Sequence, residues 1–229
     1  MAQPEAPRLE LSIVIPTLDS ADFLARTMAS IEPAHGEVIV VDGGSRDETA
    51  ALAGSLGAKV MTATTGRGAQ LAIGADAARG DWLLFLHGDT RLSQGWWDAA
   101  KRFMDKHDEG RAAYFRYALD DAAPAARRLE VVVAWRCRLL GLPYGDQGLL
   151  ISRASYNDLG GFRPLPLMED VEFVRRMGGK HLTKLDAHAI TSAARYRRDG
   201  YLRRSLRNVT CLMLYFLGLP PRSLVRLYG

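Results

Sequence analysis

Cysteine is scarce in this sequence of 229 residues, and Cys137 and Cys211 stand far apart without a CxxC pair. That spacing argues against a zinc ribbon or a redox pair and suits a reducing compartment. Long hydrophobic runs are also lacking, because the apolar stretch at 209–219 is too short to span a bilayer. Residues 1–10 are polar and acidic and do not predict a signal peptide. We therefore expect a cytoplasmic protein.

Glycine-rich phosphate loops are absent as well. No GxGxxG follows the first apolar run, and no GxxxxGK[ST] occurs anywhere. A Rossmann dinucleotide fold and a P-loop enzyme are therefore not supported. The chain also lacks a Pro-, Gly- or Ser-rich linker and an internal repeat, which favours one α/β domain over 1–229.

Acidic residues are few in the second half of the chain. Residues 1–110 hold ten basic and sixteen acidic residues, whereas residues 111–229 hold twenty and ten. From Arg195 onward there are eight arginines and one acid, Asp199. The C-terminal part is therefore expected to meet something anionic. Nucleic acid, an acidic membrane surface and a phosphorylated substrate all fit this charge.

Apolar runs and helical stretches alternate through the first half. This rhythm predicts a parallel sheet covered by helices on both faces. The expected strands are 11–15, 37–41, 59–62 and 81–86, and the helices between them include 69–78. The second half is less regular, with helices expected at 93–107 and 124–140 and strands at 113–119 and 149–152.

Polar and glycine residues follow the first four strands, at the sheet edge where α/β proteins bind ligands. Asp42 could accept hydrogen bonds from a ribose or base, or it could simply form a turn. His87-Gly88-Asp89 directly follows an apolar strand. A carboxylate there could hold a divalent cation that bridges two phosphates, although a simple turn is an equal alternative.

A pair of carboxylates, Glu169 and Asp170, stands at the expected start of a helix, after Pro164 and Pro166. Acidic residues stabilise a helix N-terminus, so capping is one interpretation. The other is that a carboxylate at the sheet edge takes a proton from an acceptor hydroxyl.

The order of the motifs SIVIPT, EVIVVDGGSRDET, GRGAQ, GDWLLFLHGDT and GGFRPLPLMEDVEF resembles the family 2 glycosyltransferases of GT-A fold. The resemblance covers nearly the whole chain. The details GRGAQ, LLFLHGDT, PYGDQG and TSAARY look like the small bacterial subgroup named for arsenosugar biosynthesis. The resemblance implies a mostly parallel Rossmann-like sheet flanked by helices, with a C-terminal helical extension.

The resemblance also implies roles for individual residues. Asp170 would be the general base, with Glu169 supporting it, and Asp89 would bind Mn²⁺ or Mg²⁺. Asp146 and Gln147 would line the acceptor side. Residues 1–110 would form the nucleotide-sugar-binding half, 111–195 the acceptor-side half and 196–229 a basic and apolar helical segment. Donor binding is implied for Pro16, Thr17, Leu18, Asp42, Gly44, Arg67, Gly68, Gln70, His87 and Asp89.

The sequence departs from the family pattern at several positions. His87 replaces the usual first Asp of the DxD motif, so metal binding rests more heavily on Asp89. Asp19 and Ala72 stand where the subgroup often has Asn, and QxxRW is absent, which argues against a processive polymer synthase.

Three functions are compatible with these features. The first is inverting transfer of a sugar from a nucleoside diphosphate sugar to a hydroxyl acceptor, without nucleic acid as a partner. The second is a nucleotidyltransferase, which would normally show a phosphate loop after the first strand. The third is a non-catalytic binding module, an alternative that His87 keeps open.

The segment 201–217 predicts a helix with a broad apolar face. At helical spacing, Leu202, Leu206, Val209, Met213 and Phe216 form one stripe. The stripe could pack on the sheet or against a second subunit, or it could lie on a membrane surface with the arginines on anionic headgroups. A peripheral site at the inner face of the membrane is thus an open alternative.

Overall fold

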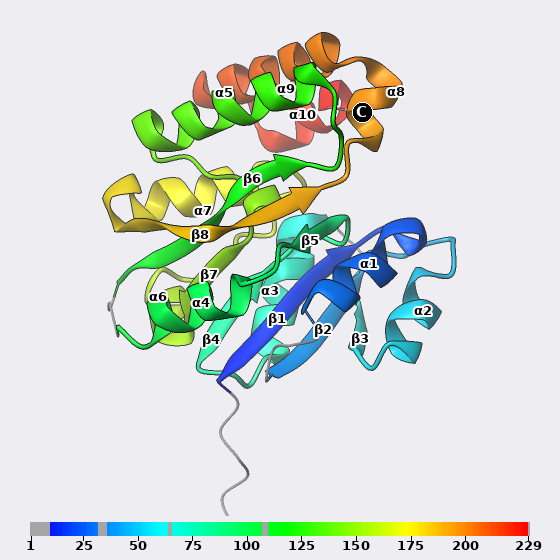
Figure 1. The fold of residues 1–229 in the computed structure, drawn as a ribbon, viewed down its shortest axis with the longest axis vertical. Helices are drawn as coiled ribbons and strands as arrows, with labels where there is room; N and C mark the ends of the chain where they lie inside the picture. The colour runs from blue at the N-terminus through cyan, green and yellow to red at the C-terminus, as the bar shows by residue number, and fades with distance from the viewer. Residues whose placement is uncertain (1–9, 32–35, 64–65, 107–109, 229) are drawn as a thin grey trace, which may run out of the picture.

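The computed structural model describes residues 10–31, 36–63, 66–106 and 110–228. Within them, one sheet has the strand order β3-β2-β1-β4-β7-β6-β8-β5 and is flanked by helices (Figure 1). The first four strands that the sequence predicts are present as β1 (Leu11–Thr17), β2 (Gly36–Asp42), β3 (Lys59–Thr62) and β4 (Trp82–Phe85). They are mutually parallel, as expected.

The second half adds strands of both directions. β7 (Leu149–Ser152) pairs antiparallel with β4 and with β6 (Ala112–Leu119), and β6 pairs parallel with β8 (Leu182–Thr191). The short β5 (Thr90–Leu92) closes the far edge antiparallel to β8. The sheet is thus mostly parallel and not wholly so. The long strand β8 and the strand β5 were not predicted from the sequence.

Helices cover both faces of the sheet because its strands are apolar on both sides. Leu11, Ile13 and Ile15 of β1 pack toward α1 (Ala21–Ile31), α2 (Thr49–Ser55) and α4 (Trp96–Met104). Val14 points the opposite way, with Leu71 of α3 (Arg67–Ala77). α6 (Arg153–Asp158) and α7 (Glu169–Met177) share that second face. The expected helix end at His107 lies outside the described residues.

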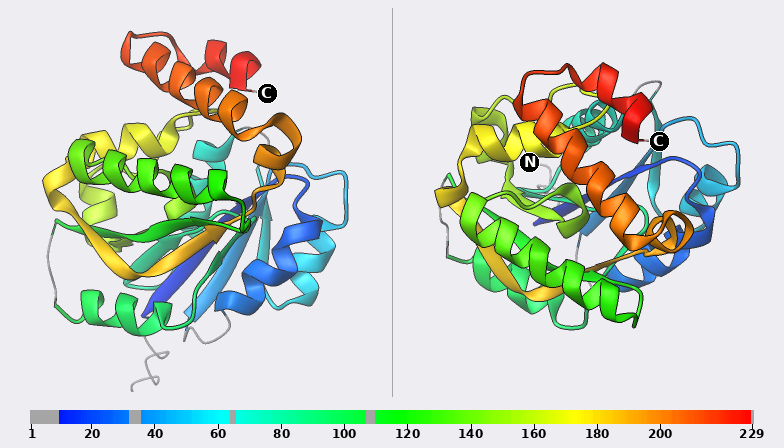
Figure 2. Two further views of the ribbon diagram at one scale, coloured as in Figure 1. Left: turned by 45° about the horizontal axis from the view of Figure 1, so that its top comes forward. Right: turned by 90° about the horizontal axis from the view of Figure 1, so that it is seen from above.

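The remaining helices gather at the top of the molecule as drawn, beyond the carboxyl ends of β1 and β2 (Figure 1; Figure 2). They are α5 (Pro124–Leu140), α8 (Ala194–Asp199), α9 (Tyr201–Phe216) and α10 (Pro221–Tyr228). The expected helices at 124–140 and from Tyr201 onward are therefore present. In the described part of the chain, no helix has the length and apolar character needed to cross a membrane.

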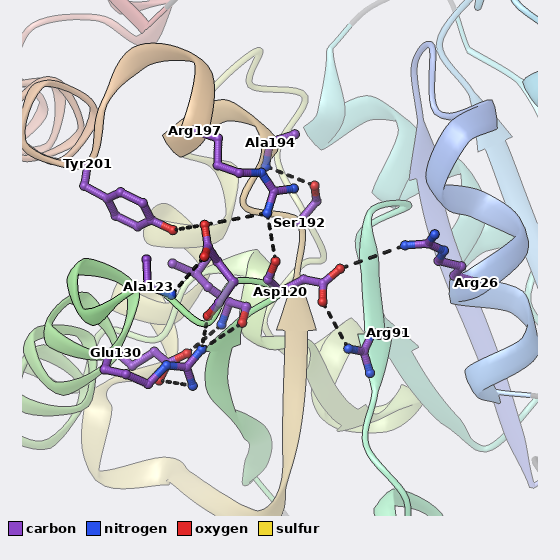
Figure 3. A network of polar contacts seen from close by, with 12 residues as sticks. Arg26, Arg91, Asp120, Ala123, Glu130, Ser192, Ala194, Arg197 and Tyr201 are labelled. Carbon is purple, nitrogen blue, oxygen red and sulfur yellow. Dashed lines mark hydrogen bonds and ion pairs between the residues drawn. The ribbon is translucent and has the colours of Figure 1, made fainter.

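A network of polar contacts ties the start of this C-terminal segment to the sheet (Figure 3). Arg197 of α8 donates a hydrogen bond to the carbonyl of Asp120, at 3.0 Å. The Tyr201 hydroxyl donates to Oδ2 of Asp121, at 2.9 Å. Asp120 in turn pairs with Arg91 of β5, at 3.3 Å. α8 and the first turn of α9 are thus fixed to the loop that follows β6.

Candidate active site

The carboxyl ends of β1 and β2 lie side by side, with Thr17 opposite Asp42 in the register. The Asp42 carboxylate organises the loop that follows it. Its Oδ2 accepts hydrogen bonds from the backbone amides of Gly44 and Ser45, at 3.0 and 2.9 Å. The Thr17 hydroxyl donates to its Oδ1, at 3.3 Å. These contacts are those of a turn-forming aspartate, and its predicted contact with the nucleotide stays a prediction.

Other residues predicted to bind the donor also hold the loops in place. The Gln70 amide donates to the carbonyls of Thr17 and Val41, at 2.8 and 2.7 Å, and so joins α3 to both strand ends. At Gly68, a Cβ atom would lie 2.3 Å from the carbonyl oxygen of Arg163, so only glycine fits there. Predicted donor contacts at Pro16, Thr17, Leu18 and Gly44 remain predictions; Leu18 is exposed and Pro16 and Thr17 are buried.

One cavity gathers five of the residues singled out in the sequence. Arg67, His87, Asp89, Asp146 and Asp170 come from α3, the loop after β4, the 3-10 turn Gly145–Gln147 and α7. With its open mouth, the cavity holds about 830 Å³ of empty space. The rest of its lining comprises Tyr117, Tyr144, Leu167, Met168, Val171, Thr191, Ser192, Arg195, Tyr196, Arg204, Asn208, Leu212 and Tyr228.

The two adjacent carboxylates of α7 differ in their surroundings. The Glu169 side chain is fully buried and accepts a hydrogen bond from Nε of Arg67, while its Oε2 has no hydrogen-bond partner. Burial raises the pKa of Glu169, and the neighbouring Arg67 opposes that shift. Asp170 instead faces the cavity. Glu169 therefore holds Arg67, and Asp170 is the member of the pair placed for chemistry.

Short backbone contacts orient the Asp170 carboxylate. Its Oδ2 accepts a hydrogen bond from the amide of Gly145, and its Oδ1 accepts one from the amide of Val171, both at 2.7 Å. Nη2 of Arg67 lies 3.9 Å from Oδ2. Met168, the residue before the pair, has a left-handed backbone with φ of 64°. A bulky residue rarely adopts this conformation, and such strain concentrates at functional sites.

Asp146 carries a carboxylate oxygen, Oδ1, that is buried without a hydrogen-bond partner. The pKa of Asp146 is raised to about 6, chiefly by burial; Arg136 opposes the shift, and the nearby Asp170 and Asp89 add to it. A carboxylate with such a pKa exchanges its proton near neutral pH. The prediction that Asp146 faces a ligand therefore gains support from its position in the cavity.

Gln147 does not line this cavity. Its Oε1 accepts hydrogen bonds from Arg136 of α5 and from Sγ of Cys137, at 3.1 and 3.2 Å. Its amide donates to the carbonyl of Phe115 in β6, at 3.2 Å. Gln147 thus joins α5 to the sheet, and its predicted acceptor contact remains untested.

His87 and Asp89 border the same cavity. The pKa of His87 lies well below its usual range because the ring is buried and stands near Arg67 and Arg195. Its imidazole is therefore neutral at pH 7 and carries one free nitrogen lone pair. Within the described residues, the Asp89 carboxylate accepts one long hydrogen bond, from the Thr191 hydroxyl at 3.5 Å. A Cβ on Gly145 would lie 2.5 Å from Nε2 of His87, so glycine makes room for this ring.

A divalent cation fits the donors present around Asp89. Carboxylate oxygens and a neutral imidazole are ligands that Mn²⁺ accepts. Oδ1 of Asp146, which is buried without a hydrogen-bond partner, is a further oxygen that a cation could use. Within the described residues no group of three His, Cys, Asp or Glu side chains could hold a metal by itself. The phosphates of a nucleotide would have to supply the remaining ligands.

The sequence reasoning missed the side of the cavity made by the last quarter of the chain. Arg195 lines the cavity, is exposed and forms no ion pair with the described residues, and it belongs to the motif TSAARY. That motif was the only available signal. Arg204 and Tyr228 reach the cavity from α9 and α10, and Arg204 lies 4.5 Å above the Tyr228 ring. Arg204 and Tyr228 could be assigned to the cavity only from the tertiary structure, in which α9 and α10 pack over the site.

A mostly parallel α/β sheet with carboxylates and arginines beyond its strand ends defines a protein of the GT-A class. The chain belongs to Glycosyl transferase family 2, since the model of that family matches residues 12–165. This confirms the family that the motifs indicate.

Curated relatives agree with the family. An uncharacterized glycosyltransferase of Rickettsia felis is 32% identical over 111 residues, which are 48% of this chain and 38% of that protein. A PGL/p-HBAD biosynthesis glycosyltransferase of Mycobacterium bovis is 35% identical over 116 residues, 45% of this chain and 44% of that protein. The matched segment thus spans less than half the length of these relatives.

Solved structures show the same fold. Staphylococcus aureus TarS in complex with UDP-GlcNAc has a TM-score of 0.64 at 15% identity, covering 96% of this chain and 70% of that chain. Glucosyl-3-phosphoglycerate synthase from Mycobacterium tuberculosis, in complex with Mn²⁺, UDP and glucosyl-3-phosphoglycerate, has a TM-score of 0.57 at 20% identity, covering 80% and 70%. The GT-A architecture expected from the sequence is therefore confirmed.

Proposed function

We propose that this protein transfers a sugar from a nucleoside diphosphate sugar to a hydroxyl group of an acceptor, with inversion at the anomeric carbon. The observation that carries this proposal is the cavity itself. It brings the carboxylates of Asp89, Asp146 and Asp170 together with the cation Arg195, which pairs with no acid among the described residues. The family and the UDP-sugar complex of TarS support a nucleotide sugar as donor.

Asp170 takes the role of general base. Two backbone amides and Arg67 hold its carboxylate in one orientation, with the side chain on the cavity wall. The base removes the proton of the acceptor hydroxyl as its oxygen attacks the anomeric carbon. The bond from that carbon to the diphosphate breaks, and the diphosphate leaves. Attack from the face opposite the leaving group inverts the anomeric carbon.

Arg195 stabilises the departing diphosphate through its positive charge. Its guanidinium lines the cavity and has no ion-pair partner in the part of the chain that the structure describes, unlike Arg67, which Glu169 and Asp170 already neutralise. Free positive charge aimed at a developing anion lowers the barrier of group transfer.

Asp89 would hold a divalent cation, with His87 beside it as a neutral nitrogen ligand. Such a cation supplies charge neutralisation to the diphosphate when it is bound. A Mn²⁺ complex of glucosyl-3-phosphoglycerate synthase supports this role by analogy of fold.

The alternatives are less well supported. A nucleotidyltransferase would need a phosphate loop after β1. The backbone amides that follow Thr17 are instead held by the chain after β2: the Asp19 amide donates to Oγ of Ser45 at 2.9 Å, and the Ser20 amide donates to Oγ1 of Thr49 at 2.8 Å. A non-catalytic module would not need a carboxylate held in one orientation on the cavity wall, as that of Asp170 is. The motifs GRGAQ, LLFLHGDT, PYGDQG and TSAARY support placement in the arsenosugar-named subgroup.

Hydrolysis and transfer with a panel of uridine, guanosine and thymidine diphosphate sugars, each with Mn²⁺ or Mg²⁺, test the proposal. We expect one donor to be cleaved and Asp170→Asn to cut kcat by roughly 10²-fold or more while donor affinity stays close to wild type. Asp98→Asn, an exposed aspartate of α4, is the matched control. Binding without turnover of any donor would favour the non-catalytic module.

A further inference from the structure

The apolar stripe of α9 faces solvent. Leu202, Leu206, Val209, Met213 and Phe216 are 74%, 58%, 53%, 60% and 44% exposed. The opposite side of the helix is the inner one, where Arg204 and Cys211 are buried and Asn208 lines the cavity. The expectation that this stripe packs on the sheet is therefore wrong. A soluble helix normally turns its apolar side inward, so this outward stripe needs a partner.

The stripe is part of a larger surface. α5 exposes Val131, Val132, Trp135 and Leu139, with Trp135 58% exposed. α10 adds Val225 and Leu227. α5, α9 and α10 lie at the same end of the molecule in the views of Figure 1 and Figure 2. We call these exposed apolar residues of the three helices the apical surface.

Arginines lie on all three helices of the apical surface, whereas α9 and α10 carry no acidic residue. Residues 201–228 contain arginine at 203, 204, 207, 222 and 226 and no acidic residue. Arg203, Arg222 and Arg226 are exposed and pair with no acid among the described residues. On α5, Arg128 and Arg138 are likewise exposed. Apolar side chains ringed by unpaired cations complement an anionic bilayer surface.

We propose that the apical surface docks this protein onto membranes that carry anionic lipids. The arginines would contact the lipid phosphates, and Trp135 and the stripe of α9 would enter the interface below them. A second copy of the chain is a poorer occupant. A symmetric dimer would bring the same unpaired arginines of both copies together, with no carboxylate on α9 or α10 to offset them.

The polar network at the start of α9 holds the apical surface in one position relative to the sheet. Arg197 and Tyr201 anchor α8 and α9 to the loop after β6 (Figure 3). Arg204 donates a hydrogen bond to the backbone carbonyl of Tyr228 in α10, at 3.2 Å. Cys211 of α9 and Leu224 of α10 are buried with Val171 of α7. The inner sides of α9 and α10 are thus packed against the rest of the protein, and their outer sides face solvent.

Co-sedimentation with phosphatidylcholine vesicles, with and without phosphatidylglycerol, tests the proposal. We expect the full chain to bind only the anionic vesicles and to be released by high salt. Arg203→Glu with Arg226→Glu should weaken binding by roughly tenfold or more, from about 1 kcal/mol per basic residue. Leu206→Gln with Met213→Gln should also weaken it. The controls are Arg102→Glu on α4 and Leu56→Gln, both exposed elsewhere.

Trp135 provides a second readout, independent of sedimentation. Lipids with brominated acyl chains should quench its fluorescence, and Trp135→Phe should abolish that quenching. Absence of binding to anionic vesicles at low salt would overturn the proposal. So would a dimer in analytical ultracentrifugation that Leu206→Gln with Met213→Gln dissociates, because the apical surface would then be covered by a second copy.

Discussion

Asp89 stands at the carboxyl end of β4 with a neutral histidine as its neighbour in the motif. A cation held by one carboxylate binds weakly until phosphate oxygens complete its shell. Cation and nucleotide should therefore bind together. We expect Asp89→Asn to weaken nucleotide binding in the presence of Mn²⁺ and to change it little in EDTA, as measured by isothermal titration calorimetry.

Equal loss with and without metal would show that Asp89 acts as a polar contact of the nucleotide. Asp98→Asn controls for the removal of one negative charge, because Asp98 is exposed on α4 and outside the cavity.

Asp146 should make the unfolding free energy of the protein depend on pH. Its pKa is raised from 3.8 to about 6 in the folded protein, so the native state holds a proton that the unfolded chain releases. Stability contributed by this carboxyl is therefore complete below pH 3.8 and declines as the pH rises to 6. In the Asp146→Asn variant this contribution to the pH dependence is lost, because the asparagine side chain does not titrate.

The measurement is made in EDTA and without nucleotide. Between pH 3.8 and pH 6, the unfolding free energy of wild type should fall relative to that of Asp146→Asn by about 2 kcal/mol, a figure that allows for partial exposure of the side chain. Urea unfolding at a series of pH values measures this difference. A difference that does not vary with pH would mean that the pKa of Asp146 is the same in the native and the unfolded protein.

At the scale of elements, the position of α3 depends on one close approach. A Cβ on Gly68 would meet backbone atoms of Arg163 and Leu165 at 2.3–2.8 Å. Gly68→Ala should push α3 away from that segment and move Arg67 relative to Glu169. We expect a loss of about 1–3 kcal/mol in unfolding free energy, the usual cost of overpacking.

Gly54 provides the matched control for that substitution. It lies in α2, and the nearest atom to an added Cβ is 3.9 Å away. Gly54→Ala should stabilise the protein by about 0.5–1 kcal/mol, because alanine is the better helix former. Equal effects of the two substitutions in thermal melts would contradict the packing argument.

At the scale of the whole molecule, the two halves expected from the sequence share one sheet and one core. β7 pairs with β4, β8 pairs with β5, and Leu150 is buried in the same cluster as Leu84. Unfolding should therefore be a single transition. Residues 1–110 alone would expose β4 and β5 as unpaired edges, so we expect that fragment to show no cooperative unfolding.

Circular dichroism and tryptophan fluorescence of the full chain test this expectation, because Trp82 belongs to the first half and Trp135 to the second. Coincident urea transitions confirm one cooperative unit. Two separate transitions, or a fragment 1–110 that melts cooperatively, would show that the halves fold independently.

The sequence by itself determined the parallel half of the sheet and the family. Strands such as 11–17 are apolar on both faces, which only a sheet covered on both sides accommodates, and local chemistry marks their ends at Pro16 and Asp42. The motifs also singled out Arg67, His87, Asp89, Asp146 and Asp170, which share one cavity. Such motifs are short and continuous in the chain, so they can be recognised from the sequence without knowledge of the fold.

Tertiary structure decided what depends on distant neighbours. β8 was not predicted because only its pairing with β6 and β5 stabilises it as a strand. The hydrogen bonds by which Gln70 and Gln147 join separate elements became visible only when the carbonyls that they bind were in place. For α9, the spacing of apolar residues defines the stripe. Its outward direction follows because the buried Arg204 and Cys211 occupy the inner side of the helix, and that choice is made by packing between elements far apart in the sequence.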